Sequence, residues 1–260
     1  MTVTEPARAE LGPSGALTHG LEVLRILAES EAPMTSTEIA RRVGLHQSSV
    51  SRVLKTLMAA GYVRKPDYHS FAADYGLLAL GGRATSHFAA ATRPRRAIAV
   101  FAERCEGLTV SFATLWRGQL IYLVRAQRGQ ETIGPWSGGY PLHLSSLALR
   151  ILLEAPAAEA REALAESRRK YGWDQPTARV PGSEAACLSA ARERLRHDVL
   201  VLDDWQAFGR LTAAIPVAAE GQPPLALSLS GNVSHVPIET VLLLLQEGRR
   251  EVERAMREPG

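Results

Sequence analysis

The stretch from Gly44 to Val63, GLHQSSVSRVLKTLMAAGYV, holds side chains that can read the edges of nucleic-acid bases. Wound onto an α-helix, it has one apolar side, which carries Val50, Val53, Leu54 and Leu57. The opposite side is polar or basic and carries Gln47, Ser48, Ser51, Arg52 and Lys55. No acidic residue occurs in the stretch, so this outward face suits a negatively charged partner.

Duplex DNA is the partner that such a helix fits best. An α-helix can enter the major groove of B-DNA, where its first turns meet the base edges. Gln47 can pair with adenine through two hydrogen bonds, whereas Arg52 can pair with guanine or hold a phosphate. The small serines allow a close approach while still offering hydroxyl groups. The sequence therefore predicts a recognition helix that begins near Gln47.

Basic residues without acidic neighbours extend beyond this helix. Between Ile39 and Pro66 the charged side chains are all cationic, namely Arg41, Arg42, Arg52, Lys55, Arg64 and Lys65. Neutralising phosphates and releasing their counterions would supply most of the affinity for DNA. Backbone amides at the start of the preceding helix would hold a further phosphate. The predicted DNA-binding residues are Thr35, Thr37, Arg41, Arg42, Gln47, Ser48, Ser49, Ser51, Arg52, Lys55, Arg64, Lys65 and His69.

Three short helices and a hairpin are expected to position these side chains. Thr35 and Glu38 have the spacing of a capping box that begins the second helix, and Gly44 ends that helix. The expected order is a helix over about 17–29, a second ending at Gly44, a third over about 47–59, and strands over 62–65 and 70–73. This order is that of a winged helix-turn-helix.

After Leu77 the pattern changes to that of a separate α+β domain. A helical stretch over 82–92 is interrupted by Pro94, because proline removes a donor and clashes with the preceding turn. Alternating segments predict strands over 108–115, 119–126, 199–204, 211–218 and 225–231. Helices are predicted over 95–105, 145–154, 156–170, 183–197 and 236–256. These elements favour a mostly antiparallel sheet with helices packed on it.

The predicted organisation therefore has four parts. They are a flexible tail over 1–15, a winged helix-turn-helix DNA-binding domain over 16–81, a linker helix over 82–93 and an effector-binding domain over 94–257. The tail is rich in Ala, Pro, Gly and Ser, a composition that favours disorder.

Charge, cysteine content and apolar runs limit the classes of protein to which this chain can belong. The net charge is only +3, so any affinity for nucleic acid must come from local clustering. Cys105 and Cys187 lie far apart without the spacing of a zinc site, and we expect buried free thiols. The N-terminus lacks a continuous apolar core, and the apolar run over 241–245 is far too short to cross a membrane. We therefore expect a soluble cytoplasmic protein with no metal and no cofactor.

The segments HGLEVLRIL, TSTEIARRVGLHQSSVSRVLKTLMAAGYVRK and LLALGGR resemble the IclR family of bacterial transcriptional regulators. YPLHLSS, FGRLTAAIPV and LALSLSG line up in order with later blocks of that family, so the resemblance spans about 16–257. It implies a winged helix-turn-helix joined by a linker helix to a GAF-like effector-binding domain. It also implies dimers through the DNA-binding part, often tetramers overall, in which a ligand shifts operator affinity or recruitment of polymerase.

The resemblance further implies an effector pocket in the C-terminal domain. Matching positions are Ser145, Ser146, Leu147, Thr212, Ser228 and Ser230, with Asp203 and Asp204 as imperfect counterparts of an acidic group. His143, which stands before Ser145 and Ser146, is expected as a capping residue or at the pocket edge. The chain departs from the family where SLALR replaces the usual glycines and lysine, and where Thr212 replaces a cysteine. We therefore expect a bulkier or less charged effector, an organic or aromatic acid or a related amide.

The residues themselves leave the nature of this pocket open. Ser228 and Ser230 alternate with leucines, so their hydroxyls share one face of a strand. That face either opens on a ligand cavity or meets water on a half-exposed strand. Aromatic side chains that could stack on a ligand, or equally belong to a core or interface, are Trp116, Trp136, Trp205, Tyr122 and Tyr140.

The predicted function is a ligand-responsive one-component DNA-binding transcriptional regulator, a repressor of a catabolic operon. A homodimer or homotetramer with two-fold symmetry would read a pseudo-palindromic operator. Two other functions stay open: a winged-helix module that docks an acidic protein, and an enzyme that uses the C-terminal pocket. The enzyme is disfavoured because no GxSxG, HExxH, GxxxxGK[ST] or GxGxxG motif occurs, although His143 stands before Ser145 and Ser146.

Overall fold

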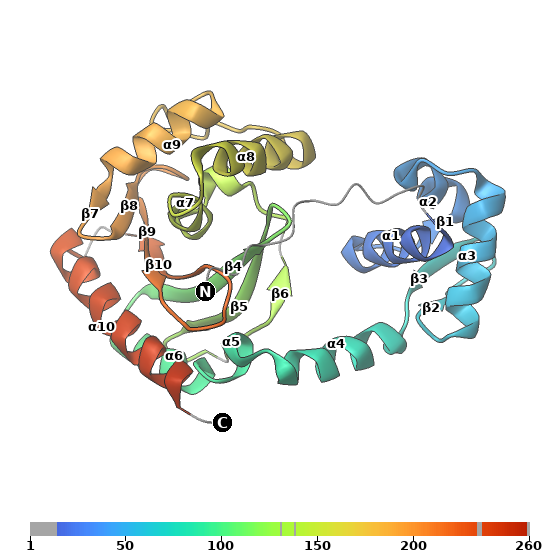
Figure 1. Cartoon of the computed structure of the whole chain (residues 1–260), viewed down its shortest axis with the longest axis horizontal. Coiled ribbons are helices and arrows are strands. Elements are labelled where there is room, and N and C mark those ends of the chain that lie inside the picture. Colours follow the sequence, from blue (N-terminus) through green and yellow to red (C-terminus); the bar gives the residue numbers. More distant parts are fainter. Residues whose placement is uncertain (1–14, 131, 138, 233–235, 259–260) are drawn as a thin grey trace. The chain divides into compact units, whose positions relative to one another are not determined.

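The computed structural model describes residues 15–130, 132–137, 139–232 and 236–258. The chain divides into two compact units, Met1–Ala84 and Thr85–Gly260, which we call unit 1 and unit 2 (Figure 1). The predicted flexible tail lies outside the described residues except for Gly15, which precedes the first helix.

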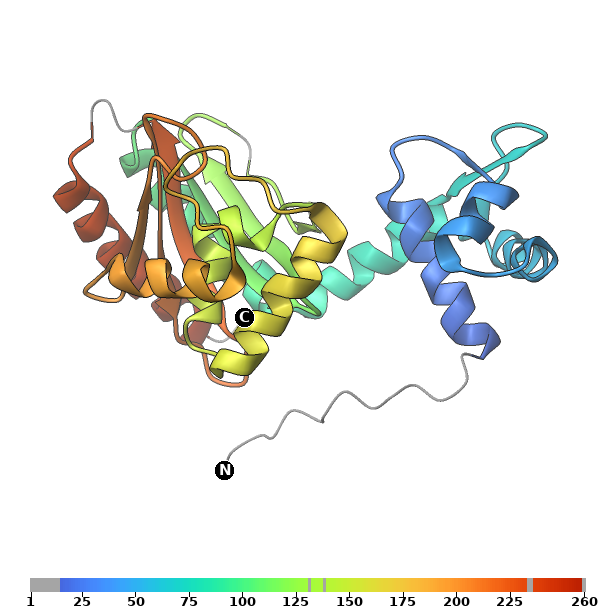
Figure 2. The same cartoon turned by 90° about the horizontal axis from the view of Figure 1, so that it is seen from above.

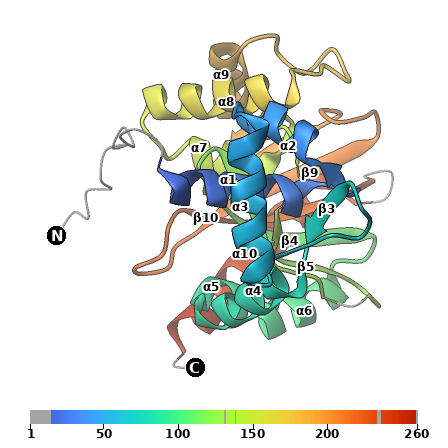
Figure 3. The same cartoon turned by 90° about the vertical axis from the view of Figure 1, so that its right-hand side faces the viewer.

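Unit 1 has the helix-turn-helix order that the sequence predicted. Its helices are α1 (Ala16–Glu29), α2 (Ser36–Val43), α3 (Gln47–Ala59) and the beginning of α4 (Tyr75–His87). An antiparallel sheet has the order β1-β3-β2, with β1 (Met34–Thr35), β3 (Ser70–Ala73) and β2 (Val63–Arg64). Figure 3 looks onto α3, with α1 crossing behind it.

An apolar core orients the three helices of unit 1. Val23 of α1, Ile39 of α2 and Val50 of α3 are completely buried, and Leu54 is only 1% exposed. Burying a side chain of this kind contributes about 1.5–3 kcal/mol. Because residues three or four apart lie on one side of a helix, burial of Val50 and Leu54 turns the polar side of α3 outward.

Local signals fix both ends of α2. The Glu38 backbone N–H donates to the Thr35 hydroxyl at 3.2 Å, and the Thr35 backbone N–H donates to the Glu38 carboxylate at 2.7 Å. This reciprocal pair is the predicted capping box. Gly44 adopts a φ of 68°, a left-handed value that glycine tolerates, and its N–H bonds to the Ala40 carbonyl. These two caps set the length of α2 and the turn into α3.

Helix α4 begins earlier than the sequence predicted. The linker helix was expected to begin at Gly82, whereas α4 is already helical seven residues earlier and is followed by the short α5 (Ala89–Thr92). Glycine weakens a helix without necessarily ending it. Gly76, Gly81 and Gly82 therefore made the sequence over α4 look less helical, although the helix forms. The Gly76 N–H donates to the Gly61 carbonyl at 3.1 Å, and a Cβ on Gly76 would lie 2.3 Å from that oxygen.

Unit 2 is built on a seven-stranded antiparallel sheet with the order β6-β5-β4-β10-β9-β8-β7. The strands are β4 (Leu108–Trp116), β5 (Gln119–Gln127), β6 (Trp136–Ser137), β7 (Leu195–Arg196), β8 (Val199–Asp203), β9 (Arg210–Val217) and β10 (Leu225–Asn232). One face carries α5, α6 (Arg95–Arg104) and α10 (Ile238–Arg257). The other carries the turn η1 (Leu142–Leu144), α7 (Ser146–Leu152), α8 (Ala157–Tyr171) and α9 (Glu184–Glu193) (Figure 2).

The two faces of this sheet have separate cores. Along β10, Leu227 and Leu229 join the core under α6 and α10, whereas Ala226 joins the core under α7. Ala113 and Ala214 lie with Ala226 in that second core, so the part of the sheet beneath α7 is made largely of small side chains. The predicted α+β class with a mostly antiparallel sheet is confirmed.

Four other elements differ from the prediction, namely α9, β7, β1 and β6. The helix predicted over 183–197 ends at Glu193, and the chain then forms β7, which pairs with β8. His197 and Asp198 have φ values of 47° and 66° in the turn between them, a pair typical of a tight hairpin. The two-residue strands β1 and β6 were not predicted, because two residues carry no periodicity. No helix in the described part of the chain is long and apolar enough to cross a membrane.

The contact at Gly76 leads to a prediction with an internal control. Gly76→Ala should lower the free energy of unfolding of unit 1 by about 1–3 kcal/mol, because the added methyl group meets a backbone oxygen. Gly82→Ala, in the same helix with no atom near the added Cβ, should raise it by up to about 1 kcal/mol. Chemical denaturation followed by circular dichroism measures both. Equal effects of the two substitutions would contradict the contact.

Candidate DNA interface and effector site

The predicted recognition surface is exposed on α3. Gln47, Ser48, Ser51, Arg52 and Lys55 all have exposed side chains, and Ser49 is half-buried. The helix begins after His46 without a side-chain cap, so its first backbone N–H groups are open to a ligand. The structure therefore brings the predicted base-reading residues to one accessible face at the N-terminal end of α3.

Cations flank this surface without acidic partners. Among the described residues, no carboxylate forms a salt bridge with Arg41, Arg42, Arg52, Lys55 or Arg64. The acidic residues that flank these cations in sequence are Glu38 and Asp67. The backbone N–H and hydroxyl of Thr35, helped by the charges of Arg41 and Arg42, hold the pKa of the Glu38 carboxyl below the usual range. This carboxylate is ionised but engaged in the cap of α2, and the Thr35 hydroxyl is engaged there with it.

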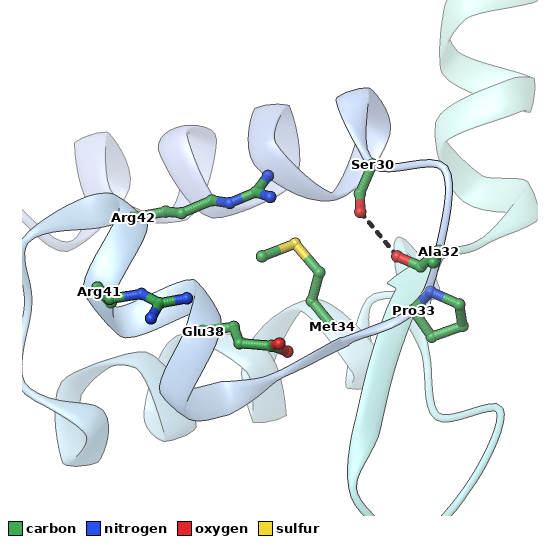
Figure 4. Close-up of a pocket in the computed structure, with 7 residues that line it drawn as sticks. All are labelled: Ser30, Ala32, Pro33, Met34, Glu38, Arg41 and Arg42. Atoms are coloured by element: carbon green, nitrogen blue, oxygen red, sulfur yellow. Dashed lines mark hydrogen bonds between the residues drawn. The ribbon is translucent and has the colours of Figure 1, made fainter.

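Arg41 and Arg42 line a small hollow beside α2. The hollow has a volume of about 180 Å³ and is formed by α2 together with the turn that leads from α1. Figure 4 shows both arginine side chains on one side of it; its lining residues are Ser30, Ala32, Pro33, Met34, Glu38, Arg41 and Arg42. Two guanidinium groups at one opening suit an anionic group such as a backbone phosphate. Thr37 is exposed in the first turn of the same helix.

The wing joins β2 to β3 and is braced by its own side chains. The backbone N–H groups of His69 and Ser70 donate to Asp67 at 2.8 and 2.9 Å. Hydrogen bonds from Ser70 and His69 hold the pKa of Asp67 below its usual range, so the carboxylate stays ionised in this turn. The Lys65 ammonium lies 4.9 Å from the centre of the Tyr68 ring, which is 81% exposed. Lys65 is therefore held along the wing, while Arg64 and His69 are exposed.

In unit 2 the predicted effector residues divide into two groups. In the antiparallel register, Ser228 lies opposite Ser111 and Ser230 lies opposite Thr212. Directly opposed residues share a face, so these hydroxyls line one side of the sheet. It is the side covered by α7, because Ala214, opposite Ser228, belongs to the core beneath that helix. Ser228 is only 4% exposed, so its strand does not meet water there.

Thr212 is the chemically unusual member of this face. Its side chain is 4% exposed, and among the described residues its hydroxyl has no hydrogen-bond partner. A buried unsatisfied hydroxyl costs about 1–3 kcal/mol, so native proteins rarely retain one without a reason. The Ser228 hydroxyl donates to the Ser111 carbonyl at 3.4 Å, a long bond that leaves it able to accept another.

An aromatic and cationic cluster on the same face was not predicted as a site. A β-bulge at Leu123, opposite Phe112 and Ala113, brings Tyr122 and Arg125 of β5 to the face that carries Ser111. Tyr122 stacks on Trp136 with ring centres 4.3 Å apart, and the Arg125 guanidinium lies 5.6 Å from the same ring. In the described part of the chain no carboxylate pairs with Arg125. Regular alternation along β5 would have separated the two side chains, so the sequence gave no signal for this cluster.

The remaining predicted effector residues have structural partners. The Ser145 hydroxyl caps α7 by accepting from the Ala148 N–H at 3.2 Å. Ser146 and Leu147 are buried in the first turn of α7. The Arg179 side chain forms salt bridges with Asp203 and Asp204, and by alternation Asp203 faces away from the side that carries Leu202 and Thr212.

His143 is fully buried, and among the described residues its Nδ1, like the Thr212 hydroxyl, has no hydrogen-bond partner. Its Nε2 bonds to the Asp174 carbonyl at 2.8 Å, and its ring stacks on Trp173 with centres 4.1 Å apart. In the part of the chain that the structure describes, no hydrogen bond joins the His143 ring to the Ser145 hydroxyl, which is the contact that a base and its nucleophile would need. Both cysteines are buried free thiols, and burial raises the pKa of Cys105 and Cys187 to about 12.

An exposed polar helix, a turn, a supporting helix and a wing define the class of DNA-binding transcriptional regulators with a winged helix-turn-helix. Comparison with known proteins agrees with this class. The family model of the IclR helix-turn-helix domain matches residues 16–67. The Transcriptional repressor IclR of Escherichia coli (strain K12) is 24% identical over 249 residues, which cover 92% of this chain and 86% of that protein.

Solved structures share the fold. The crystal structure of an IclR family transcriptional regulator from Brucella abortus has a TM-score of 0.74 at 24% identity, and 92% of each chain is covered. An IclR homologue complexed with 4-hydroxybenzoate from Microbacterium hydrocarbonoxydans has a TM-score of 0.66 at 20% identity, covering 94% of this chain and 99% of that one. The resemblance to the IclR family is thus confirmed: residues 16–67 match the IclR helix-turn-helix domain, and the chain along most of its length is similar to IclR-type DNA-binding regulators.

The environment of His143 predicts how stability depends on pH. Burial lowers the pKa of His143 below its ordinary value of about 6.5, so the folded state disfavours the protonated ring. The free energy of unfolding of unit 2 should therefore be highest above about pH 6.5 and fall as the pH drops through the folded pKa. His143→Phe keeps the ring stacking but cannot titrate, so its stability should vary less between pH 7 and pH 5.

His197→Asn is the matched control for this experiment. His197 is exposed and has a positive φ, which asparagine tolerates, so this variant removes a histidine without disturbing the ring stack of His143 on Trp173 and is compared with His143→Phe. Denaturant titrations at several pH values measure how the free energy of unfolding varies with pH. An unchanged variation in His143→Phe would show that another group is responsible for it.

Proposed function

We propose that this protein is a ligand-responsive transcriptional regulator, a repressor of a catabolic operon, that acts in the cytoplasm on a pseudo-palindromic operator. The observation that carries the proposal is the exposed side of α3, whose glutamine, serines and cations have no acidic partner among the described residues. That side belongs to the segment matched by the IclR helix-turn-helix model.

The contacts with DNA follow from the placement of each side chain. Gln47 and Arg52, at the N-terminal end and middle of α3, read base edges in the major groove. Arg41 and Arg42 hold a phosphate at the hollow beside α2, and Arg64 with His69 contacts the backbone from the wing. Phosphate contacts fix the register, whereas base contacts choose the sequence.

A homodimer supplies the two-fold symmetry of the operator. Leu17 and Leu21 of α1 are 77% and 59% exposed, and Leu78 of α4 is 70% exposed. α4 buries none of its residues within this chain. Apolar helix surfaces of this kind are suited to pairing with a second copy, and two copies place two recognition helices on successive half-sites.

The effector is an organic or aromatic acid or a related amide bound on the sheet face beneath α7. The unsatisfied Thr212 hydroxyl and the Ser228 hydroxyl offer hydrogen bonds to a ligand oxygen or amide, and Arg125 offers a charge to a carboxylate. The IclR homologue complexed with 4-hydroxybenzoate supports an aromatic acid. A ligand that prefers one arrangement of the subunits shifts the population and so changes operator affinity.

The DNA-binding part of the proposal is tested with duplexes selected from a random library. The full-length protein should recover a pseudo-palindromic sequence and bind it with a steep dependence on salt. Arg52→Ala should weaken this binding by about 1–3 kcal/mol, because it removes a base or phosphate contact. Arg25→Ala is the control, since that arginine in the same unit already pairs with Glu22 and Glu29.

The outcomes separate the competing functions. Recovery of no preferred duplex, together with binding of acidic proteins, would replace the regulator with a winged-helix protein-interaction module. Equal losses of affinity for the selected duplex in Arg52→Ala and Arg25→Ala would mean that Arg52 acts only through the net charge of unit 1.

The effector part predicts opposite effects of one substitution on stability and on ligand binding. Thr212→Val keeps the shape but removes the unsatisfied hydroxyl, so the ligand-free protein should gain about 1–3 kcal/mol in its free energy of unfolding. The same change should abolish the thermal shift produced by the acid or amide that stabilises the wild type most in a screen. Ser189→Ala, at an exposed position on α9, is the control and should leave both quantities unchanged. A full thermal shift in Thr212→Val would remove Thr212 from the effector site.

A further inference from the structure

A hydrogen bond in unit 1 joins the first residues of the two helices of the helix-turn-helix. The Gln47 Nε2 donates to the Ser36 hydroxyl at 3.0 Å. Ser36 opens α2 and Gln47 opens α3, so the bond connects the supporting helix with the end of the helix that enters the groove. Ser36 was not among the predicted DNA-binding residues, because eleven positions separate it from Gln47 in the sequence.

We propose that Ser36 is a positioning residue that presents Gln47 to an adenine in each half-site of the operator. The inference rests on the proposed function, since it concerns how the same DNA interface chooses its sequence. It assigns Ser36 no contact with a base. Its effect passes through the side-chain amide of Gln47.

The number of donors and acceptors supports this role. A glutamine amide has two N–H groups and one carbonyl oxygen. The bond to Ser36 uses one N–H, which leaves the other N–H and the Oε1 of Gln47. Adenine presents N7 as an acceptor and its N6 amino group as a donor in the major groove, and these match the two remaining groups of Gln47. Gln47 can therefore keep its hydrogen bond to Ser36 while it pairs with adenine.

The bond also selects one orientation of an exposed side chain. Gln47 is exposed, so without a partner its side chain would sample several staggered rotamers. Holding it before DNA arrives reduces the conformational entropy that base pairing would otherwise cost. The expected consequence is a stronger preference for adenine rather than a general increase in affinity.

The same bond contributes little to the stability of the fold. It joins side chains that water can reach, where exchange with water leaves a small net gain. The start of α2 is already capped by Thr35. Loss of the Ser36 hydroxyl is therefore expected to leave unit 1 folded, so that a change in base preference can be measured without interference from unfolding.

The test uses the full-length protein and the duplex recovered from the random library. Gln47→Ala identifies the base pair that Gln47 reads, as the position where preference for A·T is lost. Ser36→Ala should reduce that preference by about threefold, because loss of the hydrogen bond lets Gln47 sample about three staggered rotamers around one side-chain bond instead of one. Ser36→Thr keeps a hydroxyl and should restore it. Replacing the adenine with 7-deazaadenine removes N7 and should weaken the wild type more than Ser36→Ala.

Thr92→Ala is the control. The Thr92 hydroxyl also makes a local hydrogen bond, to the Phe88 carbonyl at 3.2 Å, but it lies on α5 in unit 2, outside the proposed DNA interface. Thr92→Ala should leave the base preference unchanged. An equal change in Thr92→Ala and Ser36→Ala, or an unchanged preference in Ser36→Ala, would overturn the inference while operator binding stands. Failure of the wild type to prefer any duplex would instead overturn the proposed function itself.

Discussion

The anchoring of α3 through Val50 and Leu54 is the constraint on which the rest of unit 1 depends. Both side chains are almost completely buried against α1 and α2, and together they fix which side of the helix faces outward. The outward side can then carry serines, a glutamine and cations, because apolar packing rather than polar pairing holds the helix in place. Glu38 fits this arrangement, since its carboxylate is engaged in the cap of α2. The cations beside it remain available to a polyanion.

In unit 2 the corresponding constraint is the register of the antiparallel sheet. Pairing of β4, β9 and β10 gathers Ser111, Thr212, Ser228 and Ser230 on the side covered by α7. A single bulge in β5 adds Tyr122 and Arg125 to that side. The fold tolerates an unsatisfied hydroxyl at Thr212, which a core built for stability alone would avoid. We interpret this cost as the mark of a site shaped for a ligand.

The two sites were predictable to different degrees. The DNA interface depends on residues close together in sequence, so its helices, the capping box at Thr35 and the exposed positions of α3 followed from periodicity and charge. The structure assigns second roles to some of them: the Thr35 hydroxyl is engaged in the cap, and Lys65 lies along the Tyr68 ring. The effector residues depended on a family resemblance. Of these, His143 and Ser145 make hydrogen bonds within the fold, and their role toward an effector stays a prediction. No signal in the sequence indicated Arg125, which lies beside the Trp136 ring on the face of the proposed site.

By itself the sequence determined the winged helix-turn-helix order, the α+β class and the side of α3 that faces outward, because each follows from local periodicity, capping and turn residues. Only the tertiary structure decided where α4 begins, that Leu195 lies in a strand, and that Ser36 meets Gln47. The start of α4 and the contact of Ser36 with Gln47 depend on residues well separated along the chain. Leu195, in contrast, pairs with Leu200 across a tight hairpin whose two-residue strand carries no periodicity. A close approach such as that of Gly76 to Gly61 leaves no periodic trace in the sequence, since it arises only when both elements have folded against each other.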